Sequence, residues 1–395
     1  MGITIIFILI LLCCLIIWKA SDGFEVASEY LGRNMSDGVR GATINAIASS
    51  IPELFATMFF LLILKDTESF SAGLGTTAGS AIFNGMIIPA VVILVVLFSG
   101  VAKSIVVSKK VILRDGISLI IAELILILII SGSTLYWWHG LILMLTYAAY
   151  ITFMFSTMTK NDENSEENEG IEEEEEEEEE EKSIFKAIWS LDLEFLVIGK
   201  SKIKSSNAWV LLISSMLVIG IACFMLVIFC EWLGNPTFEI PGLDFVFNGL
   251  DVPIMFVAVI IASAATSVPD TIISMKDAKK GNYNDAVSNA IGSNIFDICF
   301  ALGFPLFMYT IFYGEITMSP EIVQFSSELR ILLLILTVAA FFIYFIGKKM
   351  GVVKAYMLLA LYLLFTIYII GRSQEAEFAN NISVYLIDIY NLIAR

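Results

Sequence analysis

The chain has 395 residues, of which 58% are hydrophobic, and its mean hydropathy is +0.84. These values are typical of a protein with many membrane spans and exclude an ordinary soluble domain. The formal net charge of −17 is local, because 15 of the 40 acidic residues lie between positions 161 and 182 and the other 25 nearly balance 23 lysines and arginines. No basic patch indicates nucleic-acid binding.

Apolar segments of membrane-spanning length recur along the chain. Ten can be placed, five before the acidic segment and five after it: 2–19, 38–64, 73–99, 111–133, 136–158, 208–232, 249–275, 285–312, 328–347 and 352–371. We therefore predict an all-α membrane protein with ten transmembrane helices. Because five is odd, the second set enters the membrane in the opposite sense, which predicts two inverted-topology five-helix repeats.

This pattern divides the chain into four parts. We predict a first five-helix repeat at 1–158, an acidic linker at 159–207, a second five-helix repeat at 208–371 and a tail at 372–395. The tail mixes apolar and polar residues. It is either an amphipathic helix on the membrane surface or a segment packed on the bundle.

Basic residues give the orientation. With the N-terminus outside, only Lys65, Arg330, Arg372 and Arg395 fall on the external side, and the other basic residues lie in cytoplasmic segments. This asymmetry is what the positive-inside rule requires. The sequence predicts a plasma-membrane protein with both termini external and the acidic linker in the cytoplasm.

A short phrase occurs twice, once in each predicted repeat. The first copy reads Ser49-Ser50-Ile51-Pro52-Glu53, followed by Gly79-Ser80-Ala81-Ile82-Phe83-Asn84. The second copy reads Thr266-Ser267-Val268-Pro269-Asp270, followed by Gly292-Ser293-Asn294-Ile295-Phe296-Asp297. An acid inside a membrane helix is costly, so it is a functional-site hypothesis by default. Inverted repeats would bring the two copies together near the membrane midplane.

Each copy combines a helix break with oxygen ligands. Pro52 and Pro269 lack the N–H that would bond the carbonyl four residues earlier, so that carbonyl is free for another partner. In the second element of each copy, the serine and the final Asn or Asp are four residues apart and share one helix face. An all-oxygen set suits hard cations such as Ca²⁺ or Na⁺. The alternative is that these are buried polar residues that only join helices. That alternative would account for a single serine, but it accounts poorly for two acids and two prolines at matching positions in both copies.

These phrases resemble the alpha repeats of the calcium/cation antiporter superfamily, the family of sodium/calcium exchangers. The resemblance is strongest to the potassium-dependent branch and its prokaryotic relatives. The motifs that carry it cover about residues 38–90 and 249–305, and elsewhere the likeness is one of hydropathy alone. It implies a secondary active transporter rather than an enzyme. The family works by alternating access, in which the first and sixth spans slide past the other eight.

The resemblance also implies a role for each residue of the phrases. Glu53 and Asp270 match the two central Ca²⁺ ligands, which also bind Na⁺. Asn84 and Asp297 match the polar pair that completes the central cluster. Ligands of flanking Na⁺ sites are matched by Ser49, Ser50, Ser80, Thr266, Ser267 and Ser293, and backbone-carbonyl positions by Ala46 and Ser263. No resident cofactor is implied.

The charges of the acids favour antiport. Glu53 and Asp270 neutralise one Ca²⁺, and Na⁺ ions occupy the same cluster only in its absence, because excess positive charge in a low-dielectric site is costly. We predict a Na⁺/Ca²⁺ antiporter. The nearest alternative is a H⁺/Ca²⁺ exchanger that uses the same acids as proton carriers; a calcium channel and an intramembrane aspartyl protease are less favoured. Asp297 is a third acid, which is either protonated or matched by K⁺, so potassium dependence stays open.

The expected partners are inorganic cations and the lipid bilayer, without nucleic acid. We expect a monomer, with a homodimer as the alternative. Glu123, in the fourth predicted span, has no twin in the second half. It either joins a proton or ion path or makes a local hydrogen bond near the edge of the cavity.

Overall fold

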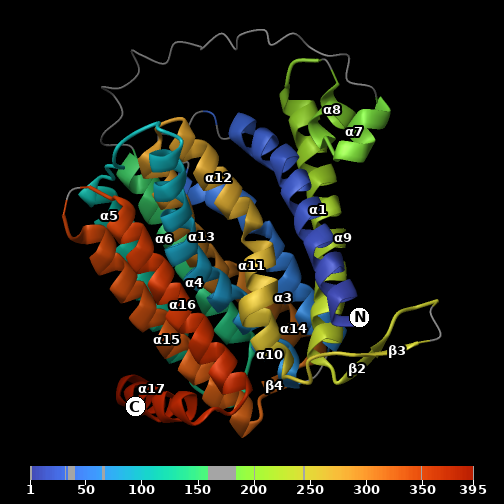
Figure 1. The fold of residues 1–395 in the computed structure, drawn as a ribbon, viewed down its shortest axis with the longest axis vertical. Coiled ribbons are helices and arrows are strands. Elements are labelled where there is room, and N and C mark those ends of the chain that lie inside the picture. Colours follow the sequence, from blue (N-terminus) through green and yellow to red (C-terminus); the bar gives the residue numbers. More distant parts are fainter. Residues whose placement is uncertain are drawn as a thin grey trace.

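The computed structural model describes residues 2–31, 33, 41–64, 67–158, 184–199, 201–242, 245–347 and 349–394. Long helices run between the two ends of the molecule (Figure 1), and they are α1 (Gly2–Leu31), α4 (Thr67–Phe98), α5 (Lys109–Ile129), α6 (Trp137–Met158), α9 (Ser205–Gly234), α15 (Pro320–Phe345) and α16 (Val352–Ser373). Two short antiparallel pairs tie loops together, β1 (Thr134–Leu135) with β4 (Ile316–Thr317) and β2 (Thr237–Glu239) with β3 (Val246–Asn248). The acidic run 172–181 lies outside the described residues.

The remaining spans are built from shorter helices placed end to end. The first half contains the π-helical turn η1 (Gly41–Asn45), α2 (Ala46–Ser49) and α3 (Ile51–Leu64). The second half contains α10 (Ile254–Val257), η2 (Ala258–Ala262), α11 (Ser263–Thr266) and α12 (Val268–Lys279). These are followed by α13 (Tyr283–Phe296), the π-helical turn η3 (Asp297–Ala301) and α14 (Leu302–Tyr313).

Eight helical segments of the described chain are long and apolar enough to cross a membrane, and a bent pair, Ala42–Ser49 with Ile51–Ile63, makes up to nine. The predicted span 111–133 corresponds to α5, which fails this test. Every stretch of 18 residues in α5 contains Arg114, Asp115 and Glu123. The helical membrane architecture is therefore confirmed, whereas ten spans and the inverted repeat remain predictions.

Both repeated phrases lie at helix breaks, as predicted. Ser50 (φ −93°, ψ 8°) separates α2 from α3, and Ser267 (φ −78°, ψ 3°) separates α11 from α12. The cause is the proline two residues later, which cannot donate a helical hydrogen bond and crowds the preceding turn. In the first half the two helices meet at an angle of 45°. Glu53 and Asp270 thus occupy the first turns of α3 and α12.

Apolar side chains form two clusters. The larger cluster contains side chains of α4, α5, α6, α13, α14, α15, α16 and α17 (Glu377–Ala394). The smaller joins α1 and α9 to α3, α10 and α11, and α1 lies along α9 on one side of the bundle (Figure 1). The first element of each repeated phrase belongs to the smaller cluster and the second element to the larger. The phrases therefore meet where the two clusters adjoin.

Several helices depart from the predicted boundaries, and α4 and α15 begin at Thr67 and Pro320 rather than at 73 and 328. α1 continues past the predicted end at residue 19, because its polar extension pairs with Lys276 of α12. The Lys276 Nζ lies 2.9 Å from Asp22 Oδ1 and 2.8 Å from Glu25 Oε2. The second part of the predicted linker is also helical, as α7 (Ile184–Ser190) and α8 (Leu193–Ile198), and α8 packs on α1 and α9.

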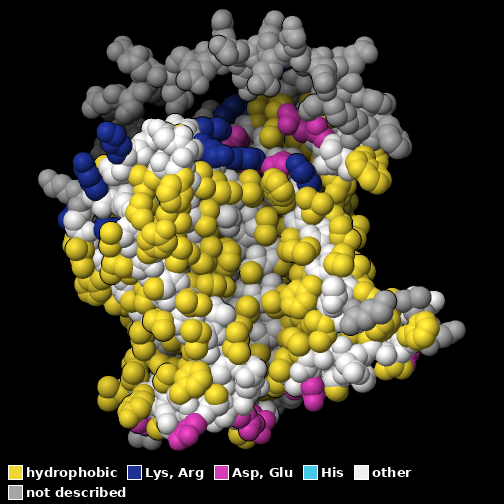
Figure 2. Space-filling view, viewed as in Figure 1, with side chains coloured by type: hydrophobic (Ala, Val, Ile, Leu, Met, Phe, Trp, Pro, Cys, Tyr) yellow, Lys and Arg dark blue, Asp and Glu magenta, His cyan; other side chains and the backbone are white. Residues whose placement is uncertain are grey.

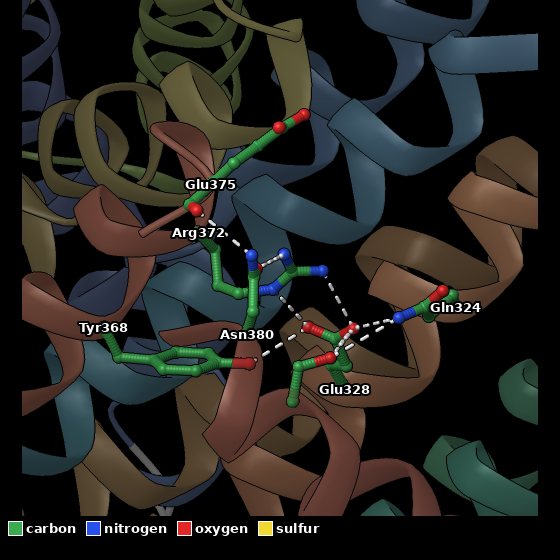
Figure 3. Close-up of polar contacts among 7 residues, drawn as sticks. Gln324, Glu328, Tyr368, Arg372, Glu375 and Asn380 are labelled. Carbon is green, nitrogen blue, oxygen red and sulfur yellow. Dashed lines mark hydrogen bonds and ion pairs between the residues drawn. The ribbon is translucent and has the colours of Figure 1, made fainter. Parts of the chain in front are cut away.

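The C-terminal tail forms α17, which packs across the ends of α15 and α16 (Figure 1). A buried carboxylate joins the three helices (Figure 3). Glu328 of α15 accepts hydrogen bonds from Tyr368 Oη at 2.9 Å, from Arg372 Nε at 2.9 Å and from Ser383 Oγ at 2.5 Å. The tail is thus a helix packed on the bundle, and an amphipathic position at the membrane surface stays a prediction.

The surface divides into zones that suit a membrane. Figure 2 shows hydrophobic side chains over the flank that faces the viewer, and the Lys and Arg side chains visible on this face gather at the upper end. Large apolar side chains such as Leu217, Ile221, Leu363 and Leu364 are more than half exposed. Exposure of this kind is stable where lipid replaces water as the solvent.

Candidate ion-binding site

The two helix breaks and two unbroken helices bring acids and hydroxyls to one place. Glu53 and Asp270 lie just after the breaks, and α4 and α13 cross beside them. α4 carries Ser80 and Asn84. Ser293 lies near the C-terminus of α13, and Asp297 is the first residue of η3. These six side chains are fully buried, with none of their surface exposed.

Ser80 is the centre of the first part of the site. Its Oγ lies 3.0 Å from Glu53 Oε1, 3.0 Å from Asp297 Oδ2 and 2.8 Å from Ser267 Oγ. Ser267 Oγ is also 3.4 Å from Glu53 Oε1. One hydroxyl of the first half therefore contacts an acid from each half of the chain.

Asp270 is the centre of the second part. Its Oδ1 accepts a hydrogen bond of 2.5 Å from Ser293 Oγ, and its Oδ2 accepts one of 3.0 Å from Asn84 Nδ2. Ser49 Oγ lies 3.4 Å from Ser293 Oγ, and Asn84 Nδ2 lies 3.4 Å from Ser80 Oγ. The Asn84 amide joins the two parts, so eight of the twelve predicted residues form one hydrogen-bonded cluster.

The other four predicted residues line the helix breaks. Ser50 Oγ is buried and has no hydrogen-bond partner among the described residues. The carbonyl of Ser263 accepts a hydrogen bond from Thr266 Oγ1 at 3.1 Å, and that of Ala46 accepts one from the Ser50 amide at 3.2 Å. The Ser263 carbonyl also accepts from the Ser267 amide at 3.0 Å, and the Ala46 carbonyl also accepts from Ser49 Oγ at 3.4 Å. Both carbonyl oxygens thus already have two donors, and their role as ligands stays a prediction.

Several buried oxygens of the cluster lack a partner in the described part of the chain. They are Glu53 Oε2, Asp297 Oδ1, Asn84 Oδ1 and Ser50 Oγ. A buried polar atom without a partner is unfavourable, and a cation satisfies such oxygens. Among the described residues no three His, Cys, Asp or Glu side chains are close enough to hold a metal ion. The serines and Asn84 separate the acids, so any cation here relies on hydroxyl and amide oxygens as well.

Two glycines allow the elements to come this close. A Cβ on Gly79 of α4 would overlap the Val259 carbonyl of η2 and reach Ser263 Cβ at 2.9 Å. A Cβ on Gly292 of α13 would lie 2.7 Å from the Ala42 carbonyl oxygen of η1. In both cases backbone blocks the space, so these positions admit only glycine without a shift. Each glycine brings the second element of one phrase against the broken helix of the other half.

The sequence reasoning missed two asparagines beside the cluster. Asn45 is buried, and its side-chain nitrogen and oxygen lack hydrogen-bond partners among the described residues. Asn289 donates to Ser274 Oγ at 3.1 Å, and its Oδ1 has no partner in the same part of the chain. Both stand four residues before a predicted ligand, Ser49 and Ser293. That spacing places them on the ligand-bearing helix face and was the signal available in the sequence.

Known proteins resemble the chain in sequence and in fold. A family model described as sodium/calcium exchanger protein matches residues 5–156 and 207–371. Sodium/potassium/calcium exchanger 3 from Homo sapiens is 36% identical over 121 residues, which cover 31% of this chain and only 17% of that protein. Sodium/potassium/calcium exchanger 5 from Homo sapiens is 25% identical over 434 residues, covering 94% of this chain and 84% of that protein.

Solved structures share the fold at low sequence identity. The H⁺/Ca²⁺ exchanger CAX aligns with a TM-score of 0.55 and 15% identity, covering 97% of this chain and 92% of that one. The sodium-calcium exchanger NCX_Mj aligns with a TM-score of 0.52 and 20% identity, covering 90% and 95%. The family model spans well over half of the chain, on both sides of the acidic segment. The chain therefore belongs to the sodium/calcium exchanger protein family, within the calcium/cation antiporter superfamily, and is a multi-pass membrane protein.

Proposed function

We propose that this chain is an antiporter that exchanges Na⁺ for Ca²⁺ across the membrane by alternating access. The observation that carries the proposal is the buried cluster in which acids from both halves share hydroxyl and amide partners. Ten membrane spans in two inverted five-helix repeats are part of the proposal, since that arrangement places both helix breaks at one depth.

The predicted ligands have distinct roles in this proposal. Glu53 and Asp270 supply the two charges that balance one Ca²⁺, while Asp297 and Asn84 complete the central group. The serines and Thr266 supply hydroxyl oxygens, and the carbonyls of Ala46 and Ser263 would join as ligands by exchanging one of their two present donors for the cation. Four oxygens in the cluster can accept a cation without breaking a hydrogen bond, because they have no partner among the described residues.

Electrostatics supplies the coupling. A Ca²⁺ ion neutralises two carboxylates, and adding Na⁺ to the same enclosed site would leave excess positive charge at high cost. Occupation by Ca²⁺ and occupation by Na⁺ therefore exclude each other. Mutual exclusion at one site, reached from one side of the membrane at a time, is sufficient for antiport.

Potassium dependence is the finer part of the proposal. Asp297 is a third acid at the cluster, and a K⁺ ion would balance its charge. The matched relatives named sodium/potassium/calcium exchangers support this reading. The alternative function is H⁺/Ca²⁺ exchange, with the same acids as proton carriers. The hydroxyl groups around both acids favour Na⁺, because a proton needs only one acceptor.

The membrane orientation follows from charge. On the face drawn in Figure 2, the Lys and Arg side chains gather at the upper end of the molecule, whereas the labels in Figure 1 place both chain ends lower down. We assign the upper end to the cytoplasm, which puts both termini outside and the acidic linker inside the cell. The plasma membrane is the proposed location, and inorganic cations and lipid are the proposed partners of a monomeric protein.

The test is Ca²⁺ uptake by proteoliposomes loaded with Na⁺, with K⁺ present or absent outside. We expect uptake to require the Na⁺ gradient and to be lost in Glu53→Gln, which keeps the size of the side chain but removes its charge. Uptake driven by a pH gradient without Na⁺ would instead establish the H⁺/Ca²⁺ alternative. Flux that needs neither gradient would establish a channel.

A further inference from the structure

Glu123 is a buried acid that lies outside the ion cluster. It belongs to α5, which packs against α6, α13, α15 and the turn η3 that carries Asp297. None of its surface is exposed. A charged carboxylate inside a membrane bundle is strongly unfavourable unless a cation or several donors compensate it. The partners of Glu123 therefore decide which form of the side chain is stable.

The Glu123 side chain has one partner. Its Oε1 accepts a hydrogen bond of 2.6 Å from Thr337 Oγ1 of α15. Its Oε2 has no hydrogen-bond partner, and Glu123 makes no ion pair within the described ranges. One hydroxyl is too little to stabilise a charged carboxylate in these surroundings. The protonated form needs no such compensation.

The basic groups near α5 are engaged elsewhere. Arg114 of α5 pairs with Asp115, its neighbour in the chain, and interacts electrostatically with Asp285 of α13. Arg330 of α15 donates to the carbonyl oxygens of Ile127 and Ile130 at the end of α5 and lies over the ring of Tyr390 of α17. Neither guanidinium compensates Glu123.

The groups on the ion-cluster side connect Glu123 to the cluster. Cys299 stands two residues after Asp297 in η3, and η3 packs against α5. Tyr147 of α6 contacts the rings of Phe296 and Phe300, which lie on either side of Asp297 in the chain. On α15, Tyr344 donates to the Gly85 carbonyl. The helix that carries Glu123 therefore packs directly on the turn that carries Asp297.

A cavity of about 20 Å³ lies beside Thr337. Its lining includes Asn294 and Gly85, which directly follow the predicted ligands Ser293 and Asn84 in the chain. The volume is enough for about one water molecule. The cavity therefore joins the hydroxyl that binds Glu123 to the back of the ion cluster.

A proton is the ligand that fits this place. Glu123 and Thr337 offer three side-chain oxygens, whereas Ca²⁺ takes about six to eight. No three acidic, His or Cys side chains of the described residues group around it to hold a metal ion. A proton needs a single acceptor, and Glu123 Oε2 is one.

We propose that Glu123 is a proton-binding site coupled to the ion cluster. Oε2 carries a proton while the cluster holds no cation, and a cation bound beside Asp297 favours release of that proton as H⁺. The coupling is reciprocal, so a protonated Glu123 weakens cation binding. The consequence for transport rests on the proposed antiport, whereas the protonation of Glu123 does not.

Infrared spectroscopy of the full chain in lipid tests the proton directly. The C=O stretching band of protonated carboxylic acids is recorded over a pH series, with and without Ca²⁺. We expect a component of this band that Ca²⁺ reduces and that Glu123→Gln removes. Thr337→Val should shift that component, because it deletes the hydrogen bond to Oε1. Glu328→Gln is the matched control, since Glu328 is equally buried but forms an ion pair with Arg372, and this variant should leave the component in place. A band unchanged in Glu123→Gln overturns the proposal.

Calcium binding tests the coupling. The slope of log Kd for Ca²⁺ against pH gives the number of protons released when Ca²⁺ binds. In Glu123→Gln this number should be smaller than in the wild type by up to about one. An unchanged slope refutes the coupling to the cluster. If Glu123→Gln removes the infrared component but Ca²⁺ uptake by the wild type does not depend on Na⁺, the proposed antiport is rejected and the proton site is retained. If wild-type uptake is driven by Na⁺ but the band is unchanged in Glu123→Gln, the antiport is retained and the proton site is rejected.

Discussion

Asn84 of α4 and Asp270 of α12 stand 186 positions apart and are joined by a hydrogen bond of 3.0 Å from Nδ2 to Oδ2. Neither half of the chain contains this pair by itself. A second bond across the halves runs from Ser80 Oγ to Asp297 Oδ2 at 3.0 Å. The ion cluster therefore exists only when both halves pack, and a change at either end of such a bond affects ligands of both halves.

Asn84→Ala removes the amide that donates to Asp270. The carboxylate keeps Ser293 as a donor but loses one of its two short contacts, and a buried group deprived of a partner loses about 1–3 kcal/mol. We expect the Ca²⁺ concentration for half-maximal uptake to rise roughly tenfold, on the basis of that loss. Measuring uptake over a range of Ca²⁺ concentrations checks this. Asn235→Ala, in an exposed turn, is the control and should behave as wild type.

Asp297→Asn tests the proposed potassium role. The amide keeps the size of the side chain and can still accept from Ser80, but it removes the third negative charge. We expect stimulation of uptake by K⁺ to disappear, while Na⁺-driven Ca²⁺ uptake persists at a reduced rate. The measurement is the ratio of uptake with and without external K⁺ in wild type and variant. Stimulation that survives in Asp297→Asn contradicts the role assigned to this acid.

The parts of the fold that lipid dictates were accessible from the sequence. Apolar length marks a membrane helix, and a proline within it marks a break, so both broken helices lie where Pro52 and Pro269 predict them. The spacing of the ligands on α4 and α13 also follows from helical periodicity. What periodicity does not determine is which residue of the other half each ligand meets. The contacts of Ser80 with both Glu53 and Asp297 are a consequence of packing.

Other features depend on partners far away in the chain. The extension of α1 beyond its apolar part is paired with Lys276, more than 250 positions later, and hydropathy carries no signal for that contact. α5 fails a hydropathy test because it contains Arg114, Asp115 and Glu123, and hydropathy cannot show that two of these pair inside the protein: Asp115 accepts from Arg114 and from Ser288 Oγ at 2.7 Å. The two missed asparagines, Asn45 and Asn289, were visible as a spacing but lacked a motif that pointed to them.

Gly292→Ala tests the close packing of α13 on η1. The added Cβ would lie 2.7 Å from the Ala42 carbonyl oxygen and 2.8 Å from its Cα, and backbone cannot move aside as a flexible side chain can. Overpacking of this kind costs about 1–3 kcal/mol. We expect a lower midpoint of thermal unfolding and loss of uptake. Gly85→Ala is the matched control on α4, because its nearest neighbour, Asn294 Nδ2, is 3.6 Å away and the helix favours alanine.

Arg372→Gln tests whether the Glu328 network holds α17 on the bundle (Figure 3). Arg372 contacts Glu328 through Nε at 2.9 Å and Nη2 at 3.1 Å, so its removal leaves a fully buried carboxylate with only neutral donors. Breaking one side of a buried pair costs about 3–5 kcal/mol, and we expect the midpoint of thermal unfolding to fall accordingly.

The double variant Glu328→Gln/Arg372→Gln separates the stranded charge from lost packing. With both charges gone, the amide at position 328 can still bond Tyr368 and Ser383, so the double variant should be more stable than Arg372→Gln alone. Asn380→Ala, which removes one exposed hydrogen bond to Arg372, should lower the midpoint only slightly. If the double variant unfolds at a temperature no higher than Arg372→Gln, the stranded carboxylate is not the cause and the contacts of α17 itself carry the stability.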